Sequence, residues 1–157
     1  MTKRTLFSCV FVLGCLGFCD MLGWGQTETD DKGLKEDYRL IDGLWETQIQ
    51  DAQGRMVTVT KSEHERKSVV TAYDINGNVV HAHTSEFVLK RVGDVKVFRF
   101  WNKTSTKGPQ AGVVQKEPRE YVYKIVGDRL YEIQGAMIRP ENDTPSILVW
   151  KRIDKST

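Results

Sequence analysis

The chain has 157 residues, a length that fits a single domain. It carries 23 Lys and Arg against 21 Asp and Glu, and no stretch of it is strongly basic. The net charge of +2 gives no reason to expect nucleic-acid binding, and the 39% of hydrophobic residues argues against a disordered chain.

Residues 1–25 have the layout of a secretory signal peptide. Lys3 and Arg4 form a short basic start, and an apolar run follows them. Gly23 and Gly25 then place small residues at the −3 and −1 positions of a cleavage site. We therefore expect a secreted or periplasmic protein whose mature chain begins at residue 26.

Two other interpretations of this segment stay open. A membrane anchor needs about 20 continuous apolar residues, and here glycines and Asp20 interrupt the run. A lipoprotein would be lipidated at Cys15. All three cysteines (Cys9, Cys15 and Cys19) lie in the segment. A mature chain without it has no disulfide, no thiolate metal site and no cysteine nucleophile, and we expect no stable membrane span after its removal.

After the signal peptide, residues 26–39 are polar and are expected to lead into a short helix. Thr29 or Asp30 would cap this helix, because their side-chain oxygens can accept the free amide hydrogens of its first turn. Residues 40–154 form the folded domain, in which turn signals come at short and regular intervals. The strongest of these signals is Asn76-Gly77, which tolerates the positive φ of a hairpin turn.

The runs between these turns are rich in Val, Ile, Thr, Tyr and Phe, which favours strands. We expect strands near residues 43–50, 55–61, 66–75, 78–91, 94–102, 119–126, 129–135 and 146–153. Eight antiparallel strands joined mostly by hairpins predict an all-β, up-and-down barrel, since closure removes the exposed edges of an open sheet. A sandwich of two sheets is the alternative.

Two segments qualify this simple meander. Residues 95–101 are apolar on both faces, so the face that is not core needs a cover. The N-terminal helix, a long loop or a second subunit would supply it, which leaves a homodimer open. Residues 102–118 are expected to form a long connection that is either disordered or a lid over the barrel mouth.

The two ends of the domain carry motifs that suggest a family. Gly43-Leu44-Trp45 opens the first strand, and Trp150-Lys151-Arg152 closes the last. This pairing resembles the lipocalin-like (calycin) barrels, in which a G-x-W motif starts the first strand and an Arg of the last strand packs over the Trp. The resemblance implies that Gly43 and Trp45 form this motif and that Arg152 is the partner at the closed end. The alternative is an ordinary core tryptophan and a surface cation.

The resemblance covers about residues 40–153. The stretch from Tyr123 to Tyr131, with Arg139-Pro140 and the last strand, is also similar to small secreted lipocalin-like domains of the planctomycete type. Together these similarities imply that the domain at 40–154 is a lipocalin-like β-barrel.

An eight-stranded barrel leaves an interior wide enough for side chains or for one small ligand. Tyr121 and Tyr123 are the best inward candidates, because their strand alternates clearly, and Phe87 is a third. Their rings offer apolar surface, and each Tyr adds a hydroxyl that can orient a ligand. We therefore predict non-covalent binding of a small, mainly apolar molecule. The alternative is a protein-interaction or inhibitor module with a filled interior.

Other chemistry has weaker support. His81 and His83 are one residue apart on a predicted strand and point the same way, a spacing that can chelate a metal. Nothing fixes a third ligand, so we expect no metal site. Ser62 and His64 lie in a polar turn, and the carboxylates are scattered among basic residues. We therefore expect neither an enzyme nor a cofactor.

Overall fold

The computed structural model describes residues 31–51, 53–137 and 144–153. The predicted signal peptide, the predicted helix caps and Arg139-Pro140 lie outside these residues. The elements in chain order are α1 (Asp31–Ile41), β1 (Gly43–Gln50), β2 (Met56–His64), β3 (Lys67–Tyr73), β4 (Val79–Val92), β5 (Val95–Lys107), β6 (Val114–Gln115), β7 (Arg119–Val126), β8 (Arg129–Gln134) and β9 (Ser146–Ile153). No helix among the described residues is long and apolar enough to cross a membrane.

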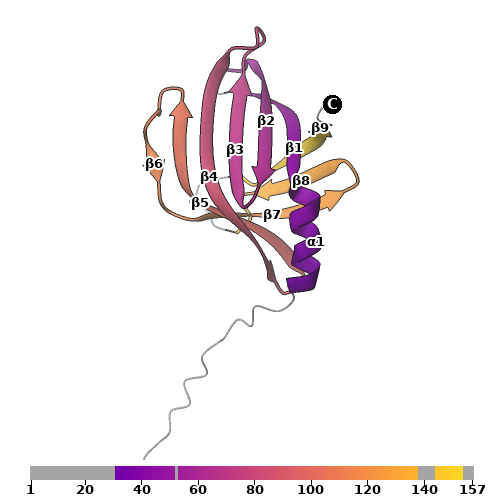
Figure 1. Ribbon diagram of the computed structural model, residues 1–157. Coiled ribbons are helices and arrows are strands. Elements are labelled where there is room, and N and C mark those ends of the chain that lie inside the picture. Colours follow the sequence, from indigo (N-terminus) through magenta and orange to yellow (C-terminus); the bar gives the residue numbers. More distant parts are fainter. Residues whose placement is uncertain (1–30, 52, 138–143, 154–157) are drawn as a thin grey trace, which may run out of the picture.

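The strands form a closed antiparallel barrel (Figure 1). Neighbouring strands pair in the order β4-β3-β2-β1-β9-β8-β7-β5, and the further pairing of β4 with β5 closes the ring. The short strand β6 pairs with β5 and lies outside this ring of eight. The prediction of an eight-stranded, up-and-down barrel preceded by a short helix is therefore confirmed, and a two-sheet sandwich is not observed.

The inward faces follow the two-residue period of strands. On β2, Val57, Val59, Lys61 and Glu63 are buried, while the residues between them are less so. The turns also have local causes. In the hairpin between β3 and β4, one carboxylate oxygen of Asp74 accepts the amides of residues 76 and 78 at 2.9 and 2.8 Å.

The prediction that residues 102–118 form one long connection, either disordered or a lid, is wrong for residues 102–107 and 114–115, which lie in strands. β5 continues to Lys107, and β6 pairs with it through Lys103–Gln115 and Thr104–Val114. Asn102 has a left-handed backbone, with φ 51°, and the β4–β5 register shifts beside it. From this bulge onward β5 consists of polar residues, so its sequence shows no alternation of apolar and polar residues that would predict a strand.

Helix α1 closes one end of the barrel (Figure 1). The Tyr38 ring stacks on Phe87, with centroids 6.2 Å apart, and its hydroxyl accepts the backbone amide of Leu89 at 2.8 Å. Asp37 accepts hydrogen bonds from the Tyr123 hydroxyl and from the Lys96 ammonium, at 2.8 and 2.7 Å. The other end of the barrel has no helix among the described residues. The antiparallel strand order places the C-terminal ends of β1, β3, β5 and β8 there.

The segment 95–101 is buried on its inward face and only in part on the other, where Val95 is 42% exposed and Trp101 is half-buried. Phe98 and Phe100 point into the barrel, opposite Leu89 and Phe87 of β4. Val97, on the other face, is also fully buried.

Candidate functional site

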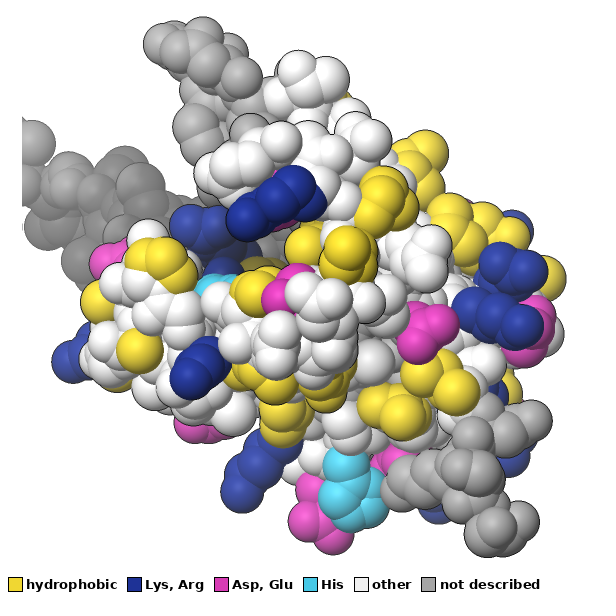
Figure 2. Space-filling view, turned by 90° about the horizontal axis from the view of Figure 1, so that it is seen from above, with side chains coloured by type: hydrophobic (Ala, Val, Ile, Leu, Met, Phe, Trp, Pro, Cys, Tyr) yellow, Lys and Arg dark blue, Asp and Glu magenta, His cyan; other side chains and the backbone are white. Residues whose placement is uncertain are grey.

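The barrel encloses a cavity of about 590 Å³ that every strand of the eight-membered ring helps to line. This volume is in the range of small-molecule sites. Its apolar wall includes Ile49, Val59, Val70, Ala72, Phe98, Phe100, Leu148 and Trp150. Figure 2 looks down on the top of Figure 1, where hydrophobic side chains alternate with basic and acidic ones and neither charge dominates.

A buried ionic cluster forms the floor of the cavity. The Lys61 ammonium donates to the Tyr121 hydroxyl at 2.6 Å and to Glu132, and it lies 3.1 Å from Oε1 of Glu63. The same ammonium lies 4.5 Å from the centre of the Phe98 ring. Three polar partners thus satisfy the three donors of this cation.

The surroundings of Lys61 keep it protonated. Burial by itself lowers the pKa of Lys61, but the carboxylates of Glu132 and Glu63 outweigh this effect and raise it. Burial and the same two carboxylates also raise the pKa of the Tyr121 hydroxyl. At neutral pH the floor therefore contains an ammonium and a neutral phenol, and neither is an activated nucleophile.

Glu63 is the residue of this cluster that can still accept a hydrogen bond. Its Oε1 accepts a hydrogen bond from Ser68 at 3.0 Å, and its Oε2 is buried with no partner among the described residues. Burial raises the pKa of Glu63 to about 7, although the Lys61 ammonium acts in the opposite direction. Glu63 also lines a smaller hollow of about 360 Å³ beside α1.

Two histidines and two cations line the cavity beyond the floor. His81 Nε2 lies 3.1 Å from His83 Nδ1, so one ring donates to the other. Burial, followed by the charge of Lys103, lowers the pKa of both rings, that of His83 to about 3. Both imidazoles are therefore neutral at physiological pH. Burial and the nearby Arg119 also lower the pKa of Lys103.

The structure separates the three residues predicted to bind a ligand. Tyr121 lines the cavity, with its ring stacked on Phe98 at 4.7 Å between centroids. Tyr123 and Phe87 are not among the lining residues. The Tyr123 hydroxyl is bound to Asp37 of α1, and Phe87 lines the smaller hollow. These two residues lie nearer the closed end, where Phe87 stacks on Phe98 with centroids 4.6 Å apart.

The motif residues lie together at the closed end. The Arg152 guanidinium is 4.2 Å from the centre of the Trp45 ring and donates to the carbonyl oxygens of Leu40 and Asp42. Gly43 has a φ of 135°, and a Cβ at this position would lie 2.5 Å from Nη1 of Arg152. The contact between Arg and Trp that the motif implies is therefore present, and glycine is the residue that leaves room for it.

Sequence reasoning missed the charged floor. Lys61 and Glu63 continue the inward row of Val57 and Val59, and Glu132 follows buried Leu130 in the same phase on β8. Charged residues at the inward positions of these two strands could have revealed the floor, because such residues are seldom buried unless they are paired.

No family model matches the chain, and no match was found among the curated proteins or the solved structures. Within the part of the chain that the structure describes, no group of three His, Cys, Asp or Glu is placed to hold a metal ion.

Proposed function

We propose that this protein is a lipocalin-like barrel that binds one small, mainly apolar molecule non-covalently. The cavity of about 590 Å³ inside a closed barrel carries the proposal, since an interior filled by side chains would leave no such space. Its walls combine aliphatic and aromatic surface with a few polar groups, as small-molecule sites do. The same cavity weighs against the alternative of an interaction module with a filled interior.

Binding without catalysis is part of this proposal. Lys61 is held as an ammonium, and Tyr121 as a neutral phenol. His83 is neutral and its ring is engaged by His81. These groups can orient a ligand by hydrogen bonding, and none of them is prepared to attack it.

We also propose that the protein is secreted or periplasmic, which rests on the sequence of residues 1–25 alone. N-terminal sequencing of the exported protein should find Gln26, within a few residues, as the first residue. An intact Met1 or a lipidated Cys15 at the N-terminus would contradict this proposal.

Titration with N-phenyl-1-naphthylamine, a neutral dye that fluoresces in apolar surroundings, tests the binding proposal. We expect saturable binding of one dye per chain. Ala72 lines the cavity, so Ala72→Phe should fill part of it and weaken binding by about tenfold or more. Val69 is on the same strand but is 43% exposed, and Val69→Phe is therefore the matched control.

The effects of the two substitutions on dye affinity decide whether the site lies inside the barrel. Binding that Ala72→Phe weakens and Val69→Phe leaves unchanged supports the interior site. No saturable binding, or equal effects of the two substitutions, would overturn it.

A further inference from the structure

Two cations that line the cavity, Lys103 and Arg119, have among the described residues no carboxylate partner of the kind that Lys61 has in the floor. The carboxylates of the floor, Glu63 and Glu132, already face Lys61. Lys103 and Arg119 line the same cavity, and no carboxylate of the described residues forms an ion pair with either of them. Lys103 is half-buried and Arg119 is exposed. A partly buried cation such as Lys103 is costly without a counterion, so a bound anion would stabilise this arrangement.

The other acidic residues of the cavity do not supply the missing charge. Glu120 Oε1 is 2.6 Å from the Lys90 ammonium and 3.6 Å from Arg99, so it is already paired. Glu117 lines the cavity but is exposed and makes no ion pair with Lys103 or Arg119.

The backbone of β5 places Lys103 at the cavity wall. Phe98 and Phe100 point inward, and regular alternation would next bring Asn102 inward. Instead, Asn102 takes the left-handed conformation and the register shifts, so that Lys103 lines the cavity. Without this bulge the Lys103 ammonium would be solvated outside the barrel. A bulge that re-aims a side chain, at a residue other than glycine, is typical of functional sites.

Trp150 is a further lining residue with a polar atom that the described residues leave unpaired. Trp150 Nε1 is buried and has no acceptor among the described residues, and Trp150 lines the cavity wall.

We propose that the ligand is an amphipathic anion, whose apolar, ring-sized body packs on Phe98, Phe100 and Trp150 and whose single anionic group binds Lys103 and Arg119. This inference rests on the proposed binding function and deepens it. Attraction between the anion and the half-buried Lys103 is stronger than it would be in water, and the exposed Arg119 adds a second positive charge. The anion also offsets the free-energy cost of burying the Lys103 ammonium.

Two dyes that differ by one charge separate this inference from the binding function itself. The neutral dye is N-phenyl-1-naphthylamine, and 1-anilinonaphthalene-8-sulfonate has the same rings and adds a sulfonate. Lys103→Met removes the charge and keeps a long apolar side chain. We expect it to weaken binding of the sulfonate dye by about tenfold and to leave the neutral dye within about twofold. Arg119→Met should act in the same direction, and Lys103→Arg should retain sulfonate binding.

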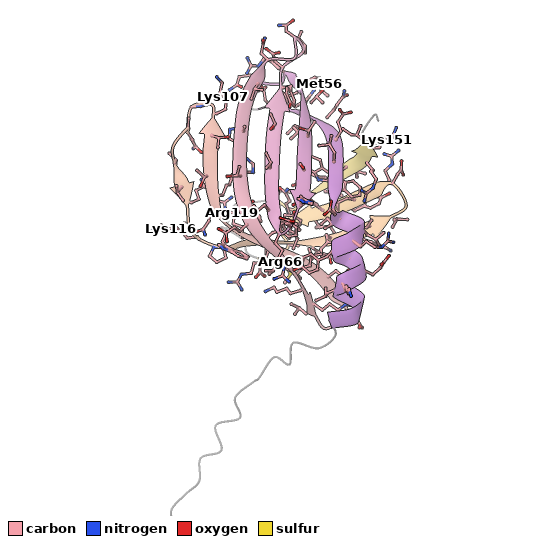
Figure 3. All side chains as sticks on the ribbon, in the orientation of Figure 1. Met56, Arg66, Lys107, Lys116, Arg119 and Lys151 are labelled. Carbon is pink, nitrogen blue, oxygen red and sulfur yellow. The ribbon has the colours of Figure 1, made fainter. Side chains whose placement is uncertain are left out.

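Lys107→Met is the matched control, because Lys107 is an exposed residue of the same strand and does not line the cavity. Figure 3 shows Lys107 and Arg119 on the side of the molecule formed by β5 and β6. Lys107→Met should leave the affinities for both dyes unchanged. If Lys103→Met and Arg119→Met change both dyes equally, or change neither, the anion site is overturned while the binding function stands. If neither dye binds the native protein, both proposals fail.

Discussion

At the scale of the residue, the most unusual group is Glu63. It is 1% exposed, and one of its carboxylate oxygens has no partner among the described residues. An ionised carboxylate in such a place is costly, and Lys61 offsets only part of the cost because it is shared with Glu132. Protonation of Glu63 is the alternative, and a pKa near 7 means that both forms are present at neutral pH.

This pKa predicts a pH dependence of stability. The pKa of Glu63 is raised from 4.5 to about 7 on folding, so the folded chain holds a proton that the unfolded chain releases. The contribution of protonated Glu63 is fully present below about pH 4.5 and is lost as the pH rises through about 7. Between pH 5 and pH 8 the native protein should lose up to about 3 kcal/mol of unfolding free energy relative to Glu63→Gln.

Urea unfolding at the two pH values measures this difference. Glu46→Gln is the control, because Glu46 is exposed and makes no ion pair among the described residues, so its neutralisation should not alter the pH dependence. A Glu63→Gln variant whose stability follows the native protein across this range would show that Glu63 is ionised throughout.

At the scale of the element, β9 and β1 hold the end of helix α1. Arg152 of β9 donates to the carbonyl oxygens of Leu40 and Asp42, and Trp45 Nε1 of β1 donates to that of Ile41 at 2.8 Å. The last carbonyls of a helix have no partners within the helix. The stacked Arg152 and Trp45 side chains therefore cap α1 and close the barrel with one set of contacts.

A double-mutant cycle tests this unit. Trp45 is fully buried, so Trp45→Ala should cost about 3–5 kcal/mol of unfolding free energy. Arg152→Ala should also destabilise the protein, and the two losses should be non-additive by about 0.5–3 kcal/mol because the side chains touch. Lys151→Ala combined with Trp45→Ala is the control, since Lys151 is exposed and its effect should add. Additive losses for Trp45 and Arg152 would mean that the two side chains do not act together.

The strands show how far the sequence predicts this fold. The expected strands at 43–50, 119–126 and 146–153 have the observed bounds, because turn residues limit them and apolar residues alternate within them. The end of β5 was missed because the bulge at Asn102 shifts the alternation, and the two-residue strand β6 is too short to show any pattern.

The candidate site was less predictable than the fold. Lys61 and Glu132 are 71 positions apart and meet only because the barrel closes. Tyr121 and Tyr123 share one face of β7, and the sequence does not reveal that the cavity ends between them. That boundary depends on where α1 docks, since Asp37 of the helix holds the Tyr123 hydroxyl.

At the scale of the whole molecule, the barrel has two halves with different tasks. The half nearer α1 is packed with aromatic side chains and contains the capped helix end. The other half holds the cavity, with Ile49 and Gln134 near its strand ends. Substitutions in the first half should therefore change stability, and substitutions in the second should change binding.

A titration of the isotopically labelled protein with N-phenyl-1-naphthylamine, followed by the backbone amide resonances, tests the central claim most directly. An interior site predicts saturable shifts for cavity-lining residues such as Thr47, Val70 and Gln134, and little change at Gly43 or Val126, which lie at the closed end. An absence of saturable shifts, or shifts confined to exposed residues of the outer face such as Val149, would contradict an interior binding site.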